Sequence, residues 1–155
     1  MIHIVLPFFP PSSNNAYFTR GNLRVLKKEG VKFKREVQNF LGKEHPEFLQ
    51  FFASKDKEYE VVIRLVFAAD ELYSKTWLKK EGVRRHKKND ATNRIKLLED
   101  VLVDATGHDD AQHASFTSTK TEAMPGHSPY VEIWAWGEEE SDGPVTQFLA
   151  RALAR

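Results

Sequence analysis

Hydrophobic residues alternate with polar ones in several short segments, and this two-residue period is typical of β-strands. Residues 2–6 (IHIVL) are rich in β-branched side chains and are followed by Pro7, so they predict a first strand that ends there. Residues 58–68 (EYEVVIRLVFA) predict a strand with one fully buried face and one mixed face. Residues 115–121 and 129–137 predict two more strands, which the turn EAMPGHS joins.

Two longer segments repeat their apolar residues at helical spacing. Residues 27–43 predict a helix that ends near Gly42, and its apolar stripe consists of Phe33, Val37, Phe40 and Leu41. Residues 93–105 predict a second amphipathic helix, because apolar residues recur there at intervals of three and four. The buried stripe expected for this helix consists of Ile95, Leu98, Leu102 and Ala105, with Val101 beside them.

The segments between these elements are less regular. Residues 8–20 (FFPPSSNNAYFTR) contain two prolines, two serines and two asparagines, which predict an ordered turn without regular secondary structure. A short hairpin tip follows around Gly21. Residues 44–57 permit a short helix that starts near Pro46, and residues 69–83 are an insertion that also permits one.

The order of elements is therefore strand, helix, strand, helix, strand, strand. This order favours an α/β (α+β) fold in which a small mixed sheet of about four strands is flanked by helices. A chain of 155 residues is long enough for one domain with a real core. We expect this domain to span residues 1–138, and residues 139–155 to form an acidic linker and a short C-terminal helix.

Composition excludes several classes of protein. The chain has no cysteine, so it has neither disulfides nor thiolate metal ligands. No apolar run approaches the roughly 20 residues that a membrane-spanning helix needs, and the N-terminus lacks the pattern of a signal peptide. These features predict a cytoplasmic protein that does not contact a membrane.

Charge is concentrated locally, although the net charge is only +1. Residues 75–96 contain nine Lys or Arg residues but only two acidic ones, Glu81 and Asp90. Such a run attracts a polyanion, and a solvated basic loop is the alternative that these residues leave open. The basic residues that we expect to bind phosphates are Lys79, Lys80, Arg84, Arg85, Lys87 and Lys88.

Carboxylates flank the second predicted helix. A polar stripe runs along it from Asp90 through Asn93 and Lys96 to Asp100. The simpler interpretation is a solvated face, with an ion pair between Lys96 and Asp100 and with Asp90 or Thr92 as the N-cap.

An adjacent pair of carboxylates, Asp109 and Asp110, follows the same helix. Adjacent carboxylates repel one another unless a cation or hydrogen-bond donors compensate them, and oxygen ligands are those that Mg²⁺ prefers. A metal held by Asp90 and Asp110 would activate water for phosphodiester hydrolysis, and Lys96 could stabilise the developing charge.

Two motifs resemble one known family. Residues 6–17 (LPFFPPSSNNAY) resemble the N-terminal signature of the RusA family of Holliday-junction resolvases. Residues 90–110 (DATNRIKLLEDVLVDATGHDD) resemble its catalytic segment, in which Asp-x-Asp-Asn is followed by Lys and then by a pair of aspartates. Lys120 and the Pro125–Gly126 turn also fit, and the resemblance covers most of residues 1–137.

The resemblance implies a homodimeric, Mg²⁺-dependent endonuclease (with Mn²⁺ as a possible substitute) that cuts branched DNA in recombination and repair. Many members of the family are carried on phage or prophage genomes. By motif position, Asp90, Lys96 and Asp110 match the catalytic residues, Asp109 joins the metal ligands, and Asn93 and Asp100 are supporting residues. The DNA-binding set consists of the six basic residues above together with Asn14, Asn15, Tyr17, Arg20 and Lys120.

Thr92 is the one departure within the catalytic motif, because it stands where the family has its second aspartate. A hydroxyl carries no charge and is a poorer Mg²⁺ ligand than a carboxylate. The alternative hypothesis is therefore a structure-selective DNA-binding protein with weak or no catalysis. A third reading is an α/β protein whose basic loop contacts protein or RNA.

Overall fold

The computed structural model describes residues 1–20, 23–54, 57–73, 91–107 and 113–137. Within these ranges, no helix is both long enough and apolar enough to cross a membrane. The predicted linker and C-terminal helix in residues 139–155 lie outside the described residues, as does the greater part of the insertion at 69–83.

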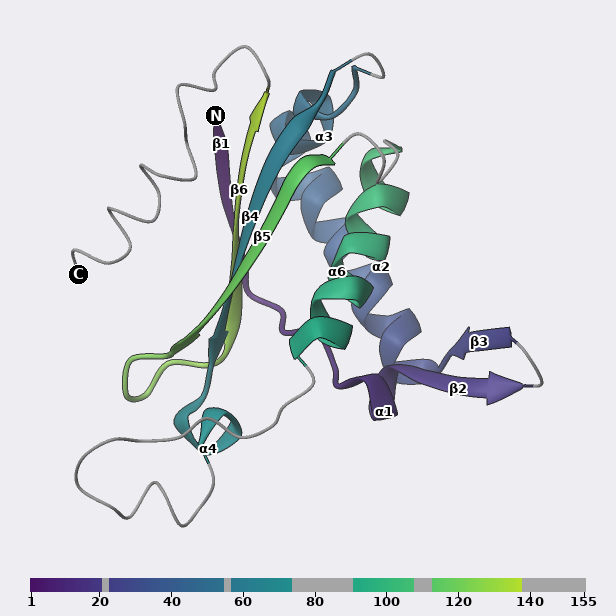
Figure 1. The fold of residues 1–155 in the computed structure, drawn as a ribbon, viewed down its shortest axis with the longest axis vertical. Helices are drawn as coiled ribbons and strands as arrows, with labels where there is room; N and C mark the ends of the chain where they lie inside the picture. Colours follow the sequence, from purple (N-terminus) through teal and green to yellow (C-terminus); the bar gives the residue numbers. More distant parts are fainter. Residues whose placement is uncertain (21–22, 55–56, 74–90, 108–112, 138–155) are drawn as a thin grey trace.

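A four-stranded sheet forms the centre of the fold (Figure 1). Its strands are β1 (Ile2–Leu6), β4 (Tyr59–Phe67), β5 (His113–Glu122) and β6 (Tyr130–Gly137), in the order β1-β6-β4-β5. The β4–β5 pair is parallel, whereas β1–β6 and β4–β6 are antiparallel. The prediction of a small mixed sheet is therefore confirmed.

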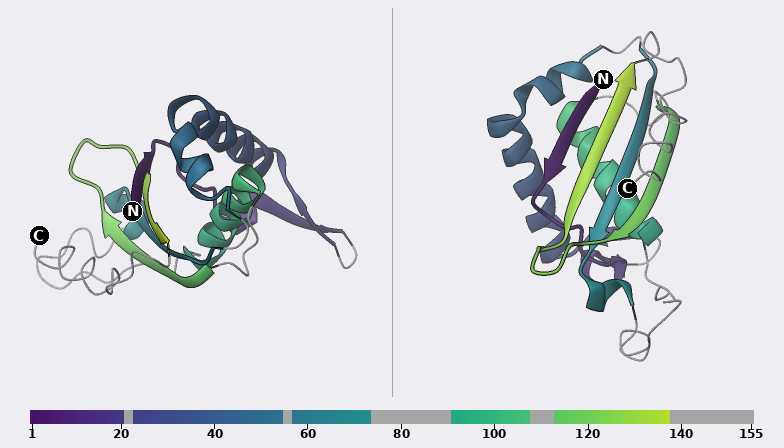
Figure 2. Two further views of the ribbon diagram at one scale, coloured as in Figure 1. Left: turned by 90° about the horizontal axis from the view of Figure 1, so that it is seen from above. Right: turned by 90° about the vertical axis from the view of Figure 1, so that its left-hand side faces the viewer.

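Three helices cover one face of this sheet, as Figure 2 shows: α2 (Lys28–Glu44), α3 (Pro46–Phe51) and α6 (Ala91–Thr106). Both long helices were predicted, and their ends differ by one or two residues from the expected positions. Because β4 and β5 are parallel, the chain between them must return along the sheet, and α6 makes this crossover. The short helix expected after residue 44 is α3, which begins at Pro46.

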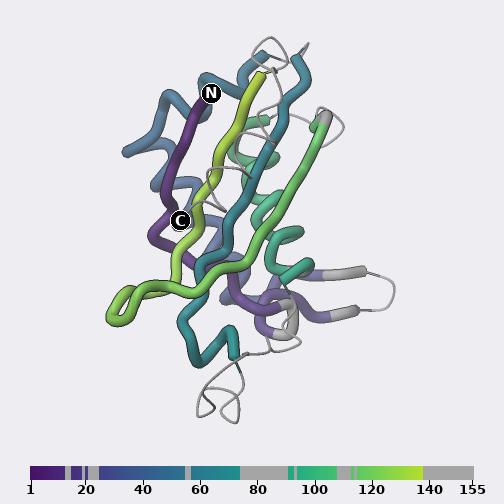
Figure 3. Tube along the Cα trace, turned by 60° about the vertical axis from the view of Figure 1, so that its left-hand side comes forward, coloured from purple at the N-terminus to yellow at the C-terminus, as the bar shows by residue number. Residues whose placement is uncertain are grey.

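A hairpin of β2 (Tyr17–Arg20) and β3 (Leu23–Leu26) extends away from the sheet and the long helices (Figure 3). The one-turn helix α1 (Ser13–Ala16) precedes it. The expectation that residues 8–20 lack regular structure was therefore wrong. The Ser12 carbonyl accepts hydrogen bonds from the N–H groups of Asn15 and Ala16, so the turn closes into a helix. The insertion also begins with one helical turn, α4 (Ala69–Leu72).

The core lies between the sheet and the helices. On β4 the inward-facing residues from Tyr59 to Phe67 are all buried, and Val62 and Val66 are buried on its other face, as the mixed pattern predicted. On α6 the buried residues are Leu97, Leu98, Val101 and Leu102, whereas Ile95 and Ala105 are only partly buried. The predicted stripe therefore missed Leu97. The reason is that α6 packs against α2 as well as the sheet, so its buried face is wider than one stripe.

Candidate functional site

Some of the predicted site residues lie within the described part of the chain, and the others lie outside it. Thr92, Lys96 and Asp100 lie on α6, and Asn14 and Asn93 are placed by their backbone in α1 and α6. Asn15, Tyr17, Arg20 and Lys120 are described as well. The predicted residues outside the described ranges are Lys79, Lys80, Arg84, Arg85, Lys87, Lys88, Asp90, Asp109 and Asp110.

The exposed face of α6 carries the expected ion pair. The Lys96 Nζ atom lies 3.8 Å from a carboxylate oxygen of Asp100, and at least half of each side chain is exposed. A pair of this kind contributes only about 0.3–0.5 kcal/mol, because both groups remain well solvated. Lys96 can therefore leave Asp100 for a phosphate at little cost. Thr92, one turn earlier, is also exposed to solvent.

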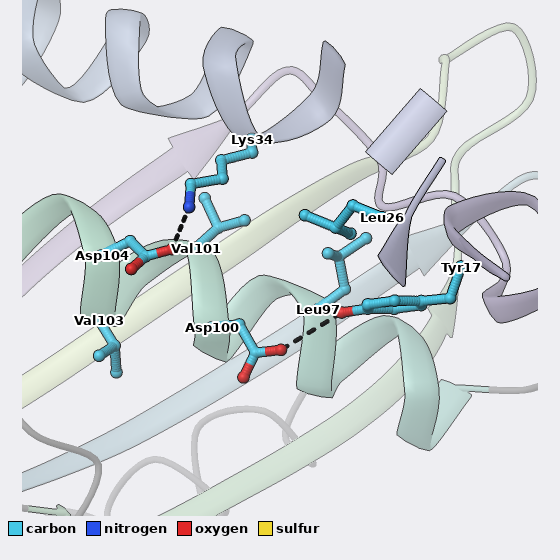
Figure 4. Close-up of a pocket in the computed structure, with 8 residues that line it drawn as sticks. All are labelled: Tyr17, Leu26, Lys34, Leu97, Asp100, Val101, Val103 and Asp104. Carbon is cyan, nitrogen blue, oxygen red and sulfur yellow. Dashed lines mark hydrogen bonds and ion pairs between the residues drawn. The ribbon is translucent and has the colours of Figure 1, made fainter. Parts of the chain in front are cut away.

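The two motifs that resemble the family meet at Asp100. The Tyr17 hydroxyl, at the start of β2, donates a hydrogen bond of 3.2 Å to the Asp100 carboxylate (Figure 4). The two residues are 83 positions apart in the chain, so only the fold joins them. The sequence predicts that Tyr17 contacts DNA and that Asp100 is a supporting residue, but it does not predict that the two side chains contact one another.

A hollow of about 380 Å³ surrounds this contact, between α6, α2 and the hairpin. Lys34 of α2 binds the Asp104 carboxylate at one side of it, and Figure 4 shows both interactions across an apolar floor. The lining residues are Tyr17, Leu26, Lys34, Leu97, Asp100, Val101, Val103 and Asp104. The hollow therefore combines carboxylates with apolar surface beside the exposed face that carries Lys96.

Arg94 is a residue whose role sequence reasoning missed. Its guanidinium donates a hydrogen bond to the Pro10 carbonyl and lies 3.7 Å from the Glu71 carboxylate. The guanidinium carbon also lies 5.1 Å from the centre of the Phe9 ring and 5.7 Å from that of Phe67. Arg94 thereby ties the N-terminal motif, the end of β4 and α4 to the first turn of α6.

The sequence did contain a signal for this role. Arg94 stands three residues before Leu97 and four before Leu98, so it continues the buried stripe of α6 toward its start. A charged residue in that position must find partners within the fold, because an unpaired buried charge is costly. By charge alone, Arg94 is simply one of the nine basic residues between positions 75 and 96.

Replacing Arg94 with Ala is expected to lower the free energy of unfolding by about 2–4 kcal/mol, because a hydrogen bond, an ion pair and two ring contacts are lost together. Arg35→Ala is the matched control, since Arg35 is exposed on α2 and the change should stay within about 0.5 kcal/mol. Urea unfolding followed by circular dichroism measures both. Equal stability of the two variants would contradict the anchoring role.

Lys120 lies at the same end of the sheet as the first turn of α6. In the parallel register it pairs with Leu65, and so it shares the sheet face that the helices cover. Two positions further along β4 is Phe67, whose ring faces Arg94. Lys120 is therefore near the end of α6 that directly follows Asp90 in the chain.

The acidic residues flank opposite ends of α6. The helix has 16 residues and is therefore about 24 Å long, with Asp90 directly before its first residue and Asp109 and Asp110 shortly after its last. His113, the first residue of β5, lies 3.4 Å from the carboxylate of Glu99, which is near the middle of α6. Within the described residues, no three acidic or histidine side chains form a group that could hold a metal. The metal prediction therefore rests on Asp90, Asp109 and Asp110, and it stays a prediction.

A comparison with known protein families identifies the same family that the two motifs resemble. No curated protein matches the chain significantly. The family model described as endodeoxyribonuclease RusA matches residues 7–133, which is well over half of the chain. The match contains the second motif and all but the first residue of the N-terminal motif, together with α6 and the strands on either side of it. The chain therefore belongs to the endodeoxyribonuclease RusA family.

Proposed function

We propose that this protein is a Mg²⁺-dependent endonuclease that resolves Holliday junctions and other branched DNA by hydrolysing phosphodiester bonds. The observation that carries the proposal is the family match over residues 7–133. The contacts of Tyr17 with Asp100 and of Arg94 with Pro10 support it, because they join the N-terminal motif to the helix of the catalytic motif.

The proposed ligands of the metal are the carboxylates of Asp90, Asp109 and Asp110. A bound Mg²⁺ would lower the pKa of a coordinated water and offset charge on a phosphoryl oxygen. Lys96 would stabilise the negative charge that develops on the phosphate, because its ammonium group is exposed and only weakly paired with Asp100. Asn93 and Asp100 are proposed as supporting residues.

The proposed DNA surface consists of the basic run at residues 79–88 together with the N-terminal motif and Lys120. The basic run leads directly into Asp90 and the first turn of α6, and Lys120 lies at that end of the sheet. Phosphates held by these residues would therefore lie beside the proposed chemistry. Each such contact also makes binding weaken as the salt concentration rises.

We further propose that two copies of the chain build each metal site. Carboxylates that share one Mg²⁺ have oxygens about 2.1 Å from it, so they must lie close together. Within one chain, the length of α6, about 24 Å, separates Asp90 from the position where the helix ends. The two residues from Gly107 to Asp109 span only about 7 Å when fully extended. In a two-fold dimer with antiparallel α6 helices, Asp90 of one chain would lie near Asp109 and Asp110 of its partner.

Thr92 offers a test of the metal assignment. The Thr92→Asp variant is expected to reach half-maximal cleavage at a Mg²⁺ concentration several-fold lower than the parent, because a carboxylate binds Mg²⁺ better than a hydroxyl. The substitution should not harm the fold, since Thr92 is exposed and an acidic residue in the first turn favours the helix dipole. A Mg²⁺ titration of the cleavage rate measures the effect. An unchanged or higher Mg²⁺ requirement would contradict a metal near position 92.

The same residue supports a second candidate function, that of a junction-binding protein that cuts poorly. A chain of this kind would bind a four-way junction tightly and in a salt-sensitive way, without nicking it in Mg²⁺ or Mn²⁺. If the Thr92→Asp variant regained nicking, the absence of cleavage activity in the parent chain would be due to Thr92.

The direct experiment on the proposed function uses a synthetic four-way junction and a linear duplex of the same sequence. We expect paired nicks at the junction in Mg²⁺, no cleavage in EDTA, and slow or no cleavage of the duplex. Equal cleavage of the two substrates would contradict selectivity for branched DNA, and no cleavage of either in Mg²⁺ or Mn²⁺ would contradict the nuclease.

A further inference from the structure

The β2–β3 hairpin projects from the body of the protein as an arm (Figure 3), and three contacts hold its base. The Ala16 carbonyl accepts a hydrogen bond of 2.7 Å from the N–H group of Lys27, which closes the base. Gly30 of α2 lies against the same base, because a Cβ atom at that position would lie 2.8 Å from the Ala16 carbonyl oxygen. The third contact is the hydrogen bond from Tyr17 to Asp100. The base of the arm is therefore fixed against α2 and α6.

Phe18 lies on the face of the arm that points away from the hollow. Tyr17 and Leu26, which pair across the two strands, both line the hollow (Figure 4). Side chains alternate along a strand, so the next pair, Phe18 with Val25, belongs to the opposite face. Phe18 is 44% exposed, and Arg20, which shares its face, is exposed as well. This face of the arm therefore presents an aromatic residue and a basic residue to solvent.

The charge of this part of the chain favours a polyanion as the partner of the arm. Residues 13–28, which include α1 and the arm, contain four basic residues and no acidic one. The first acidic residue of the whole chain is Glu29. Basic residues beside an exposed aromatic ring are typical of surfaces that bind unpaired bases, since the cations hold phosphates and the ring stacks on a base. The arm combines both kinds of residue.

We propose that Phe18 stacks on a base that is exposed at the branch point of the DNA. This inference rests on the proposed function and adds to it the feature of branched DNA that the arm recognises. Within a linear duplex each base is covered on both faces by its neighbours, whereas the stack is interrupted at a branch point. The ring can therefore stack on a base there without the cost of opening a duplex. Phe18 thus adds selectivity for branched DNA, which phosphate contacts alone do not supply.

Gel-shift titrations of the full-length chain with a four-way junction and with a linear duplex of the same sequence, both in EDTA, test the inference without cleavage. We expect Phe18→Ala to weaken junction binding at least about fivefold and to leave duplex binding within about twofold, because stacking on one base is lost. Phe18→Tyr keeps the ring and should bind both DNAs like the parent chain. Val31→Ala is the matched control and should also bind like the parent, since Val31 is an exposed apolar residue of α2, outside the arm.

A second variant, Phe18→Leu, keeps an apolar side chain on the arm but lacks a ring, and it should also lose preference for the junction. If both variants without the ring keep the preference of the parent chain, or lose affinity for both DNAs equally, the inference is overturned while the proposed function stands. The same holds if either variant converts a dimer to a monomer without DNA, as measured by light scattering, because Phe18 would then pack on a second copy. A parent chain that binds junction and duplex equally would contradict both the inference and the selectivity of the proposed function.

Discussion

The Asp110→Asn variant is expected to cut a four-way junction at least about a thousandfold more slowly than the parent chain, which corresponds to about 4 kcal/mol of transition-state stabilisation. The amide keeps the size of the side chain but removes the charge that would hold Mg²⁺. Binding of the junction in EDTA should remain within a few-fold of the parent value, because the basic run and Lys120 are unchanged. Single-turnover cleavage and a gel-shift titration measure the two effects.

Glu47→Gln is the matched control for this experiment. Glu47 is 58% exposed on α3 and is hydrogen-bonded to His45, so the change removes the same charge from an exposed residue outside the proposed ligand set. We expect it to cut at the rate of the parent chain. If Asp110→Asn also cuts at that rate, Asp110 is not a metal ligand.

A mixed dimer of one Asp90→Asn chain and one Asp110→Asn chain is expected to regain about half of the parent nicking rate, although each variant alone is inactive. The two-chain site predicts this outcome because one of the two sites receives both intact aspartates and the other receives both asparagines. The mixed dimer, isolated by two different affinity tags, should therefore make single nicks in place of paired ones. If each site were built within one chain, both sites of this dimer would be inactive.

The reciprocal dimer also distinguishes a two-chain site from a one-chain site. It joins a parent chain to a chain that carries both Asp90→Asn and Asp110→Asn. A two-chain site predicts no cleavage, because each site then contains one asparagine, whereas a one-chain site predicts about half of the parent rate. The two dimers thus give opposite results under the two arrangements. A chain that cuts no junction in its parent form would contradict the nuclease itself, so the two failures remain distinguishable.

Local sequence patterns predicted the long helices and the strands of the central sheet, together with one contact. The strand and helix periods located β1, β4, β6, α2 and α6, because these periods record which side chains face the core. The Lys96–Asp100 pair followed from a spacing of four residues on one helix. The turn at residues 8–20 was misjudged, since the closure of α1 depends on hydrogen bonds to the Ser12 carbonyl that composition does not reveal.

The sequence by itself determined the amphipathic helices and the strands, because their periods are short-range patterns, and the order of these elements favoured a mixed sheet. It also determined the resemblance to the RusA family, because that resemblance rests on two continuous motifs. Only the tertiary structure decided that Arg94 binds the Pro10 carbonyl and that Tyr17 binds Asp100, across 84 and 83 positions of the chain. Periodicity shows that a face is buried, but it does not show which distant segment lies against it. The same limit explains the proposed site. The motif names Asp90 and Asp110, whereas the length of α6 suggests that they belong to sites shared between two chains.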